Sequence, residues 1–107
     1  MELTESDAKV FFKEGMTDAE LDEHEDAIKN YDKALQIIED AEIYLNKGIS
    51  LAELEKYENA LECYNKAIEL DATDPDPWNN KGELLEELGK EEEANKCFDK
   101  VDELEAE

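Results

Sequence analysis

Apolar residues recur along this chain at steps of three and four. One stretch shows the pattern clearly: Tyr57, Ala60, Leu61, Tyr64, Ala67 and Ile68. This spacing places the apolar side chains on one face of a helix with 3.6 residues per turn. A half-buried strand would need strict alternation of apolar and polar residues, which does not occur. The pattern therefore predicts an all-α protein without strands.

The helical pattern occurs three times along the chain. The aromatic residues Tyr31, Tyr64 and Phe98 lie 33 and 34 residues apart. The same spacing holds for Ala27, Ala60 and Ala94, for Gly15, Gly48 and Gly82, for Phe11, Tyr44 and Trp78, and for Leu21, Leu54 and Leu88. The repeats run over 8–40, 41–74 and 75–107, with 1–7 as an N-terminal lead-in or cap. Each reads as two helices joined by a short polar turn, so we expect six antiparallel helices in one domain.

Several local signals agree with this organisation. Asp74 followed by Pro75 is a good helix start, and Thr4 or Ser6 can cap the first helix. Gly48 and Ala60 are small enough for the two helices of one unit to approach closely. One helical pair cannot bury its whole apolar face, so the units must stack, and about three are needed for stability.

These linked positions resemble the tetratricopeptide repeat. The second unit carries the resemblance best, at Tyr44, Gly48, Leu54, Tyr57, Ala60, Tyr64 and Ala67. The third unit matches at Trp78, Gly82, Leu88, Gly89, Ala94 and Phe98. One departure lies in the second unit, where Ala72 occupies the position at which the family usually has proline. The resemblance covers nearly the whole chain. It implies a right-handed superhelix of three helical hairpins, whose first helices line a concave groove.

The third unit departs from the pattern where a further unit would dock. Where the first two units have Ile28 and Leu61, the third has Asn95. Where they have Leu35 and Ile68, the third has Asp102. A surface helix tolerates single polar residues anywhere, but two at both docking positions favour a polar end face. The first unit likewise has Asp18 in place of Leu51 and Leu85. We therefore expect a three-repeat unit that is monomeric.

Composition restricts the partners. The chain has 33 acidic and 11 basic side chains and a net charge of −22, and every basic residue is a lysine. Such a charge argues against nucleic acid and anionic membranes, and it attracts cationic protein segments. No apolar run approaches the ~18 residues of a membrane span, and the polar start MELTESDAK predicts no secretory signal. We expect a cytoplasmic protein.

Few residues of this chain could take part in catalysis or bind a metal. We expect that the protein is not an enzyme and has no cofactor and no metal. His24 is the only histidine and is interpreted as a packing residue, and Ser6 and Ser50 belong to no nucleophile motif. Cys63 and Cys97 occupy equivalent positions about 10 Å apart, beyond disulfide reach, so both are expected to be buried thiols. The acidic run 71–76 fails the calcium-loop pattern, which needs a glycine at position six and a glutamate at position twelve.

By resemblance, ligands bind along the concave face of the first helices. The candidate groove residues are Phe12, Met16, Leu45, Asn46, Ile49, Asn80, Glu83 and Glu87. An exposed apolar patch of Phe12, Met16, Leu45 and Ile49 is expected at one end. The two asparagines can bond a peptide backbone, and Glu83, Glu86 and Glu87 attract lysine or arginine. The opposing interpretation makes the apolar residues ordinary packing and the glutamates a solvated face.

One branch of the family clamps the C-terminal carboxylate of heat-shock chaperones. It needs lysine and asparagine, then asparagine, then two basic residues. The corresponding residues here are Phe12, Met16, Asn46, Asp76 and Asn80, of which only Asn46 matches. This resemblance therefore implies a scaffold or adaptor for a peptide with apolar and basic residues. The alternative is a chaperone-like or assembly factor that shields apolar segments of client proteins.

Overall fold

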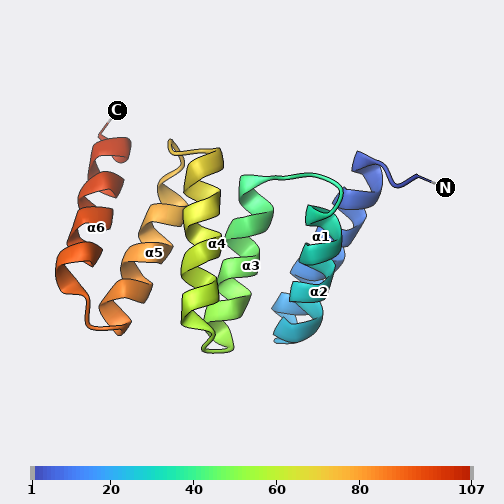
Figure 1. The fold of residues 1–107 in the computed structure, drawn as a ribbon, viewed down its shortest axis with the longest axis horizontal. Helices are drawn as coiled ribbons and strands as arrows, with labels where there is room; N and C mark the ends of the chain where they lie inside the picture. Colours follow the sequence, from blue (N-terminus) through green and yellow to red (C-terminus); the bar gives the residue numbers. More distant parts are fainter. Residues whose placement is uncertain (1, 107) are drawn as a thin grey trace.

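The computed structural model describes residues 2–106, which form six α-helices and no strand (Figure 1). The helices are α1 (Glu5–Glu20), α2 (His24–Leu35), α3 (Ala41–Glu53), α4 (Tyr57–Leu70), α5 (Pro75–Glu87) and α6 (Glu91–Glu105). The all-α class and the three helical hairpins are confirmed. The first helix, α1, begins at Glu5, directly after Thr4, which is one of the two residues expected to cap it.

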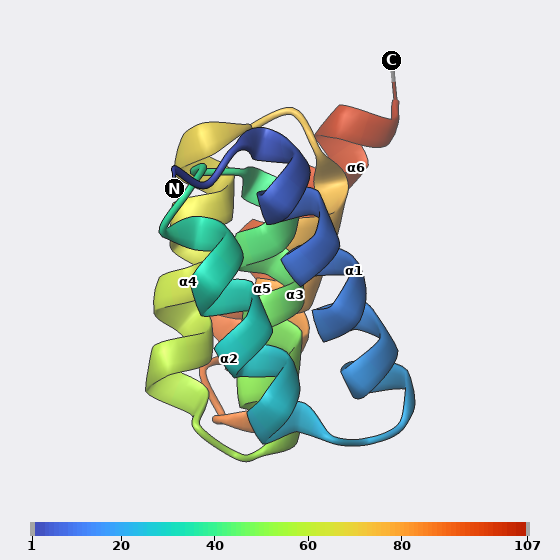
Figure 2. The ribbon, with the colours of Figure 1, turned by 90° about the vertical axis from the view of Figure 1, so that its right-hand side faces the viewer.

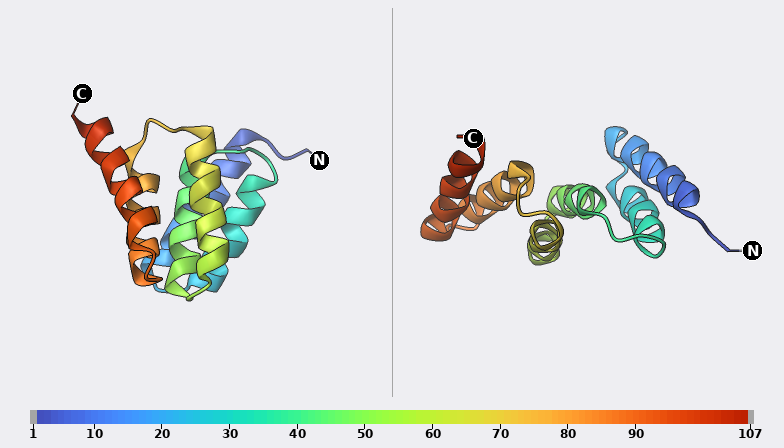
Figure 3. Two further views of the ribbon diagram at one scale, coloured as in Figure 1. Left: turned by 60° about the vertical axis from the view of Figure 1, so that its left-hand side comes forward. Right: turned by 90° about the horizontal axis from the view of Figure 1, so that it is seen from above.

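The three hairpins stack along the longest dimension of a molecule of 48 × 30 × 19 Å (Figures 1 and 3). Viewed along that dimension, they lie one behind another (Figure 2). The second helix of each hairpin packs on the first helix of the next, α2 on α3 and α4 on α5. The first helices also touch one another, α1 with α3 and α3 with α5, whereas α2, α4 and α6 do not within the described residues. The first helices therefore line the inner, concave side.

Helix starts follow the sequence signals. The Asp40 carboxylate accepts the backbone N–H of Glu42 at 2.8 Å and caps α3. Asp74 caps α5 by accepting the N–H of Asp76 at 3.0 Å, and Pro75 takes the first turn. At α1, Thr4 is the cap residue and its own N–H donates to Asp7 at 2.7 Å. Carboxylates near a helix N-terminus satisfy free N–H groups and oppose the positive end of the helix dipole.

Each hairpin is held together by an aromatic ring lying on a glycine. Tyr31 packs on Gly15 and Tyr64 on Gly48, so closely that a Cβ atom on either glycine would lie 2.6 Å from a ring carbon. The third pair is Gly82 with Phe98. The equivalent alanines of the second helices are fully buried: Ala27, Ala60 and Ala94. The predicted close approach of the paired helices is therefore confirmed.

The outer face of α6 carries the predicted polar residues. Asn95 and Asp102 are both exposed, and among the described residues α6 packs only on α5. By contrast, the equivalent Ile28 and Leu61 pack against the core of the following hairpin. At the other end of the array, Asp18 is half-buried and accepts a hydrogen bond from the Asn30 amide at 2.8 Å. Asp18 is therefore a hydrogen-bonded polar residue at the position where the other two repeats have a buried leucine, Leu51 or Leu85.

A further expectation is met by the two cysteines. Cys63 and Cys97 are both buried free thiols, and burial raises the pKa of each. Over the residues that the structure describes, the helices are too short or too polar for any of them to cross a bilayer.

Candidate peptide-binding groove

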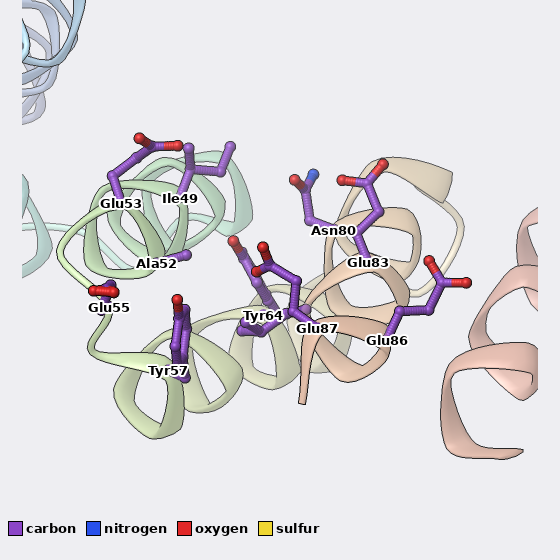
Figure 4. A pocket seen from close by; sticks show the side chains of 11 residues that line it. Ile49, Ala52, Glu53, Glu55, Tyr57, Tyr64, Asn80, Glu83, Glu86 and Glu87 are labelled. Carbon is purple, nitrogen blue, oxygen red and sulfur yellow. The ribbon is translucent and has the colours of Figure 1, made fainter. Parts of the chain in front are cut away.

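The concave side contains two adjoining cavities. The larger, of about 700 Å³, lies between α3, α4 and the C-terminal half of α5 (Figure 4). We call it the acidic pocket; its lining residues are Ile49, Ala52, Glu53, Glu55, Tyr57, Tyr64, Asn80, Glu83, Leu84, Glu86 and Glu87. The smaller, of about 410 Å³, lies between α1, α2 and α3; we call it the apolar-end pocket. It is lined by Met16, Ala19, Glu20, Asp22, His24, Tyr31, Asn46, Ile49 and Glu53. Ile49 and Glu53 belong to both, so the cavities form one continuous groove.

Most of the predicted groove residues line these cavities. The acidic pocket contains Ile49, Asn80, Glu83 and Glu87, and the apolar-end pocket contains Met16, Asn46 and Ile49. Phe12 lines a separate hollow of about 190 Å³ beside Lys9 and Glu42. Its half-buried ring also packs on Tyr31, with ring centroids 5.9 Å apart. Phe12 therefore serves the core of the first hairpin as well as the surface.

The expectation that Leu45 contributes to an exposed apolar patch is wrong. Its side chain is 8% exposed and belongs to the core of the second hairpin, with Leu51 and Leu84. Leu45 lies on the flank of α3 that packs against its neighbours, a distinction that helical spacing alone does not resolve. The apolar surface of the groove is consequently carried by Met16 and Ile49, with Phe12 set apart.

The two asparagines point into the groove with their donors partly used. The Asn46 side-chain amide donates to the Glu42 carbonyl at 2.8 Å, and the Asn80 amide donates to the Asp76 carbonyl at 3.0 Å. Both bonds run four residues back along the same helix. They hold each amide in a defined orientation and leave its oxygen as an acceptor for a backbone N–H.

The acidic pocket combines carboxylates with phenols. In Figure 4, both tyrosines rise from α4: Tyr64 toward Glu87 and Asn80 on α5, and Tyr57 toward Ala52 on α3. Glu53 and Glu55 lie on the α3 side. Burial and the charges of Glu55, Glu87 and Glu53 raise the pKa of Tyr57. Burial also raises the pKa of Tyr64, followed by the influence of Cys63, Glu83, Glu53 and Glu87. Both phenols therefore stay protonated at neutral pH and can donate or accept hydrogen bonds.

A polar cluster that the sequence did not reveal lies in the apolar-end pocket. His24 is the first residue of α2; its Nδ1 lies 3.1 Å from the Ser50 hydroxyl and its Nε2 lies 3.0 Å from the Asp22 carboxylate. Glu53 completes a group whose ligand atoms all lie within 4.8 Å of one another. Within residues 2–106, this is the one group of three such side chains close enough to hold a metal ion. It joins two repeats, so no short motif could indicate it.

The contact between His24 and Ser50 is not a catalytic pair. Ser50 is 1% exposed inside α3, so a substrate cannot reach its hydroxyl. A nucleophile needs an accessible oxygen beside its base. The histidine instead connects the start of α2 to α3, which agrees with its interpretation as a packing residue.

Six helices in stacked hairpins, with small residues at every crossing and a groove lined by the first helices, define a helical-repeat protein. Two family models match the sequence: one described as TPR repeat over residues 48–89, and one described as tetratricopeptide repeat over residues 75–107. Together they cover more than half of the chain. The chain belongs to the tetratricopeptide repeat family.

Solved structures of the same fold agree. The second tetratricopeptide-repeat domain of Spaghetti (RPAP3), bound to the HSP90 peptide SRMEEVD, is 25% identical, with 94% of each chain covered and a TM-score of 0.88. PcrH, in complex with the chaperone binding region of PopB, is 24% identical over 97% of this chain and 85% of that one, with a TM-score of 0.91. MamA is 20% identical with a TM-score of 0.87, and the match covers 91% of this chain but 57% of MamA. A comparison with curated protein sequences finds no match.

Proposed function

We propose that this protein is a non-enzymatic scaffold that binds a partner peptide along its concave groove. The apolar residues of the peptide lie near α1 and α3, and its basic residues lie near α5. The observation that carries this proposal is the composition of the groove. Met16 and Ile49 face one cavity beside Glu20, Asp22 and Glu53, five glutamates line the other, and no lysine lines either. We propose that it acts as a monomeric adaptor in the cytoplasm.

Two structural neighbours support a peptide as the ligand. The Spaghetti domain is bound to an HSP90 peptide, and PcrH is bound to a region of PopB. The ligand chemistry proposed here differs from that of an acidic peptide end such as EEVD, because the carboxylates of the acidic pocket repel it. A protein of net charge −22 also selects against nucleic acid and anionic lipid.

The neighbour PcrH favours one second candidate. Its partner is named as a chaperone binding region, so a chaperone-like role for this fold is the alternative. A holding factor suppresses aggregation of many unrelated clients, whereas an adaptor binds one defined sequence. Light scattering of two unrelated unfolding clients distinguishes the roles: suppression of both, independent of groove substitutions, favours the alternative.

The experiment that tests the proposal is selection of peptides from a random 12-residue display library at ~0.1 M salt. Selected peptides should combine apolar with basic residues. Replacing Glu83, Glu86 and Glu87 by glutamine should remove the basic preference, and Met16→Ser with Ile49→Ser should remove the apolar one. A matched control replaces Glu58, Glu62 and Glu92, which are exposed outside the groove.

The control variant carries the same change in charge and should retain both preferences, because screening limits each charge to about 10 Å at ~0.1 M salt. Selection of acidic peptides, or a preference that the groove variants leave unchanged, contradicts the proposal. Circular dichroism of each variant verifies that helical content is preserved.

A further inference from the structure

The floor of the acidic pocket contains a polar group without a protein partner. Tyr64 is 2% exposed, and no hydrogen bond joins its hydroxyl to another described residue. Every fully buried polar side-chain atom among the described residues has a partner, so this hydroxyl must keep contact with the open pocket. Figure 4 shows it directed into the hollow beside Glu87 and Asn80. A nearly buried hydroxyl aimed into a cavity calls for a hydrogen-bonding ligand.

The charges around that hydroxyl also lack a partner. Glu53 and Glu87 line the acidic pocket together with Tyr57 and Tyr64, and their charges help to raise the pKa of both phenols. The lysine ion pairs among the described residues are Lys47 with Asp32, Lys66 with Glu39 and Glu69, and Lys100 with Glu103, all outside this pocket. Bringing a cation into the pocket relieves the repulsion between its carboxylates.

The spacing of the carboxylates argues against a bare metal ion as that cation. A metal draws several ligand atoms to within ~2–2.6 Å of itself. Within 2–106, no three carboxylates of the acidic pocket come within 4.8 Å of one another, since the one such group is formed by Asp22, His24 and Glu53. The cavity of about 700 Å³ instead suits an extended cation with several donors.

Among side-chain cations, the guanidinium group meets these requirements. It presents five N–H donors in a plane, pairs with carboxylates through two parallel bonds, and stacks on aromatic rings. A lysine ammonium is a compact, strongly hydrated charge with three donors. The pocket offers separated carboxylates, the Tyr64 hydroxyl as an acceptor, and the exposed side of the Tyr57 ring for stacking.

We propose that the acidic pocket is the binding site for one arginine side chain of the partner peptide. The Tyr64 hydroxyl and the Glu87 carboxylate accept its N–H groups, Tyr57 stacks on its plane, and Glu53 adds to the negative field of the pocket. This inference rests on the proposed peptide-binding function and adds the residue that the basic end of the groove selects.

The third repeat shows which substitution can test this proposal. Phe98 occupies the position of Tyr64 and packs on Gly82 in the same way, so the fold accepts phenylalanine there. Tyr64→Phe therefore removes only the hydroxyl. Tyr31→Phe is the matched control, because Tyr31 makes the equivalent contact with Gly15 but opens into the neighbouring pocket.

The probe is N-acetyl-arginine N-methylamide, titrated into the labelled protein and followed by amide chemical shifts. Shifts should centre on Tyr64, Asn80 and Glu87. The uncharged citrulline analogue should bind at least about tenfold more weakly, the factor that loss of one charge-assisted hydrogen bond produces. The lysine analogue should also bind more weakly. Tyr64→Phe should weaken arginine binding several-fold, and Tyr31→Phe should not.

Three results overturn the arginine site: equal binding of the arginine and citrulline probes, tighter binding of the lysine probe, or unchanged affinity in Tyr64→Phe. A second probe, the blocked tripeptide acetyl-Leu-Phe-Leu-amide, separates this failure from failure of the proposed function. If that probe still shifts Met16 and Ile49, the groove binds peptides and only the arginine site is wrong. If neither probe shifts any groove residue, both proposals are wrong.

Discussion

At the scale of single residues, the turns inside the hairpins store backbone strain. Asp22, Glu55 and Gly89 occupy equivalent positions and all have positive φ, at 65°, 61° and 77°. In each turn, the next residue closes the helix by donating to a carbonyl five residues back, as Lys56 does to Leu51 at 2.9 Å. The left-handed conformation is open to glycine but costs other residues roughly 1–2 kcal/mol. Only the third repeat has the residue that this turn prefers.

The first prediction follows from that comparison. Glu55→Gly should stabilise the protein by about 1 kcal/mol, because it removes the side chain from a strained position, less the extra entropy of the unfolded chain. Chemical denaturation with circular dichroism measures the change. Glu62→Gly is the control: this exposed residue lies inside α4, where glycine should cost about 1 kcal/mol. A loss of stability in Glu55→Gly would show that its side chain contributes more than the strain costs.

At the scale of the helices, α3 and α4 can pack closely because Gly48 has no side chain. A Cβ atom at Gly48 would lie 2.6 Å and 2.8 Å from carbons of the Tyr64 ring, and 3.1 Å from the Cβ of Cys63. The ring cannot easily move, because Tyr64 is nearly fully buried between α3 and α5. The close packing of α3 with α4 therefore requires glycine at this crossing.

The second prediction concerns that crossing. Gly48→Ala should destabilise the protein by about 1–2 kcal/mol: overpacking costs roughly 1–3 kcal/mol and the better helix propensity of alanine returns up to ~1 kcal/mol. Gly82→Ala should cost less, since Phe98 is half-buried on the last helix and can shift. Thermal unfolding of both variants measures the difference. Equal losses would mean that the freedom of the ring does not decide the cost.

At the scale of the whole molecule, the large net negative charge opposes the compact folded state. A net charge of −22 on 107 residues repels itself in the folded state, and the described ion pairs neutralise only a few carboxylates. Stacking of apolar faces between hairpins must outweigh this repulsion. The same field brings cationic segments toward the groove, so the property that weakens the fold assists the proposed function.

The third prediction is that salt stabilises the protein. Raising NaCl from about 0.01 M to 1 M shortens the screening length from ~30 Å to ~3 Å and should raise the melting temperature by about 5 °C, equivalent to roughly 1 kcal/mol. Scanning calorimetry at neutral pH measures the shift. The variant with Glu58, Glu62 and Glu92 replaced by glutamine should begin higher and shift less. A melting temperature that falls with salt would indicate that ion pairs outweigh the general repulsion.

The architecture follows from patterns that are visible in the sequence alone. Six helices, their pairing, the small residues at the crossings and the polar face of α6 all follow from periods of 3.6 and about 34 residues. These features are local or recur in every repeat, so a residue such as Gly48 is interpreted from its equivalents Gly15 and Gly82. The acidic end of the groove was also visible, because consecutive turns of α5 carry Glu83, Glu86 and Glu87.

Only the tertiary structure decided which side chains share a cavity. It buried Leu45, set Phe12 apart from Ile49, and brought His24 to Ser50 and Glu53 of the next repeat. It also left the Tyr64 hydroxyl open to the acidic pocket, although Tyr64 occupies the same repeat position as the half-buried Phe98. The physical reason is that helical spacing gives the direction of a side chain, whereas its exposure depends on how neighbouring repeats stack.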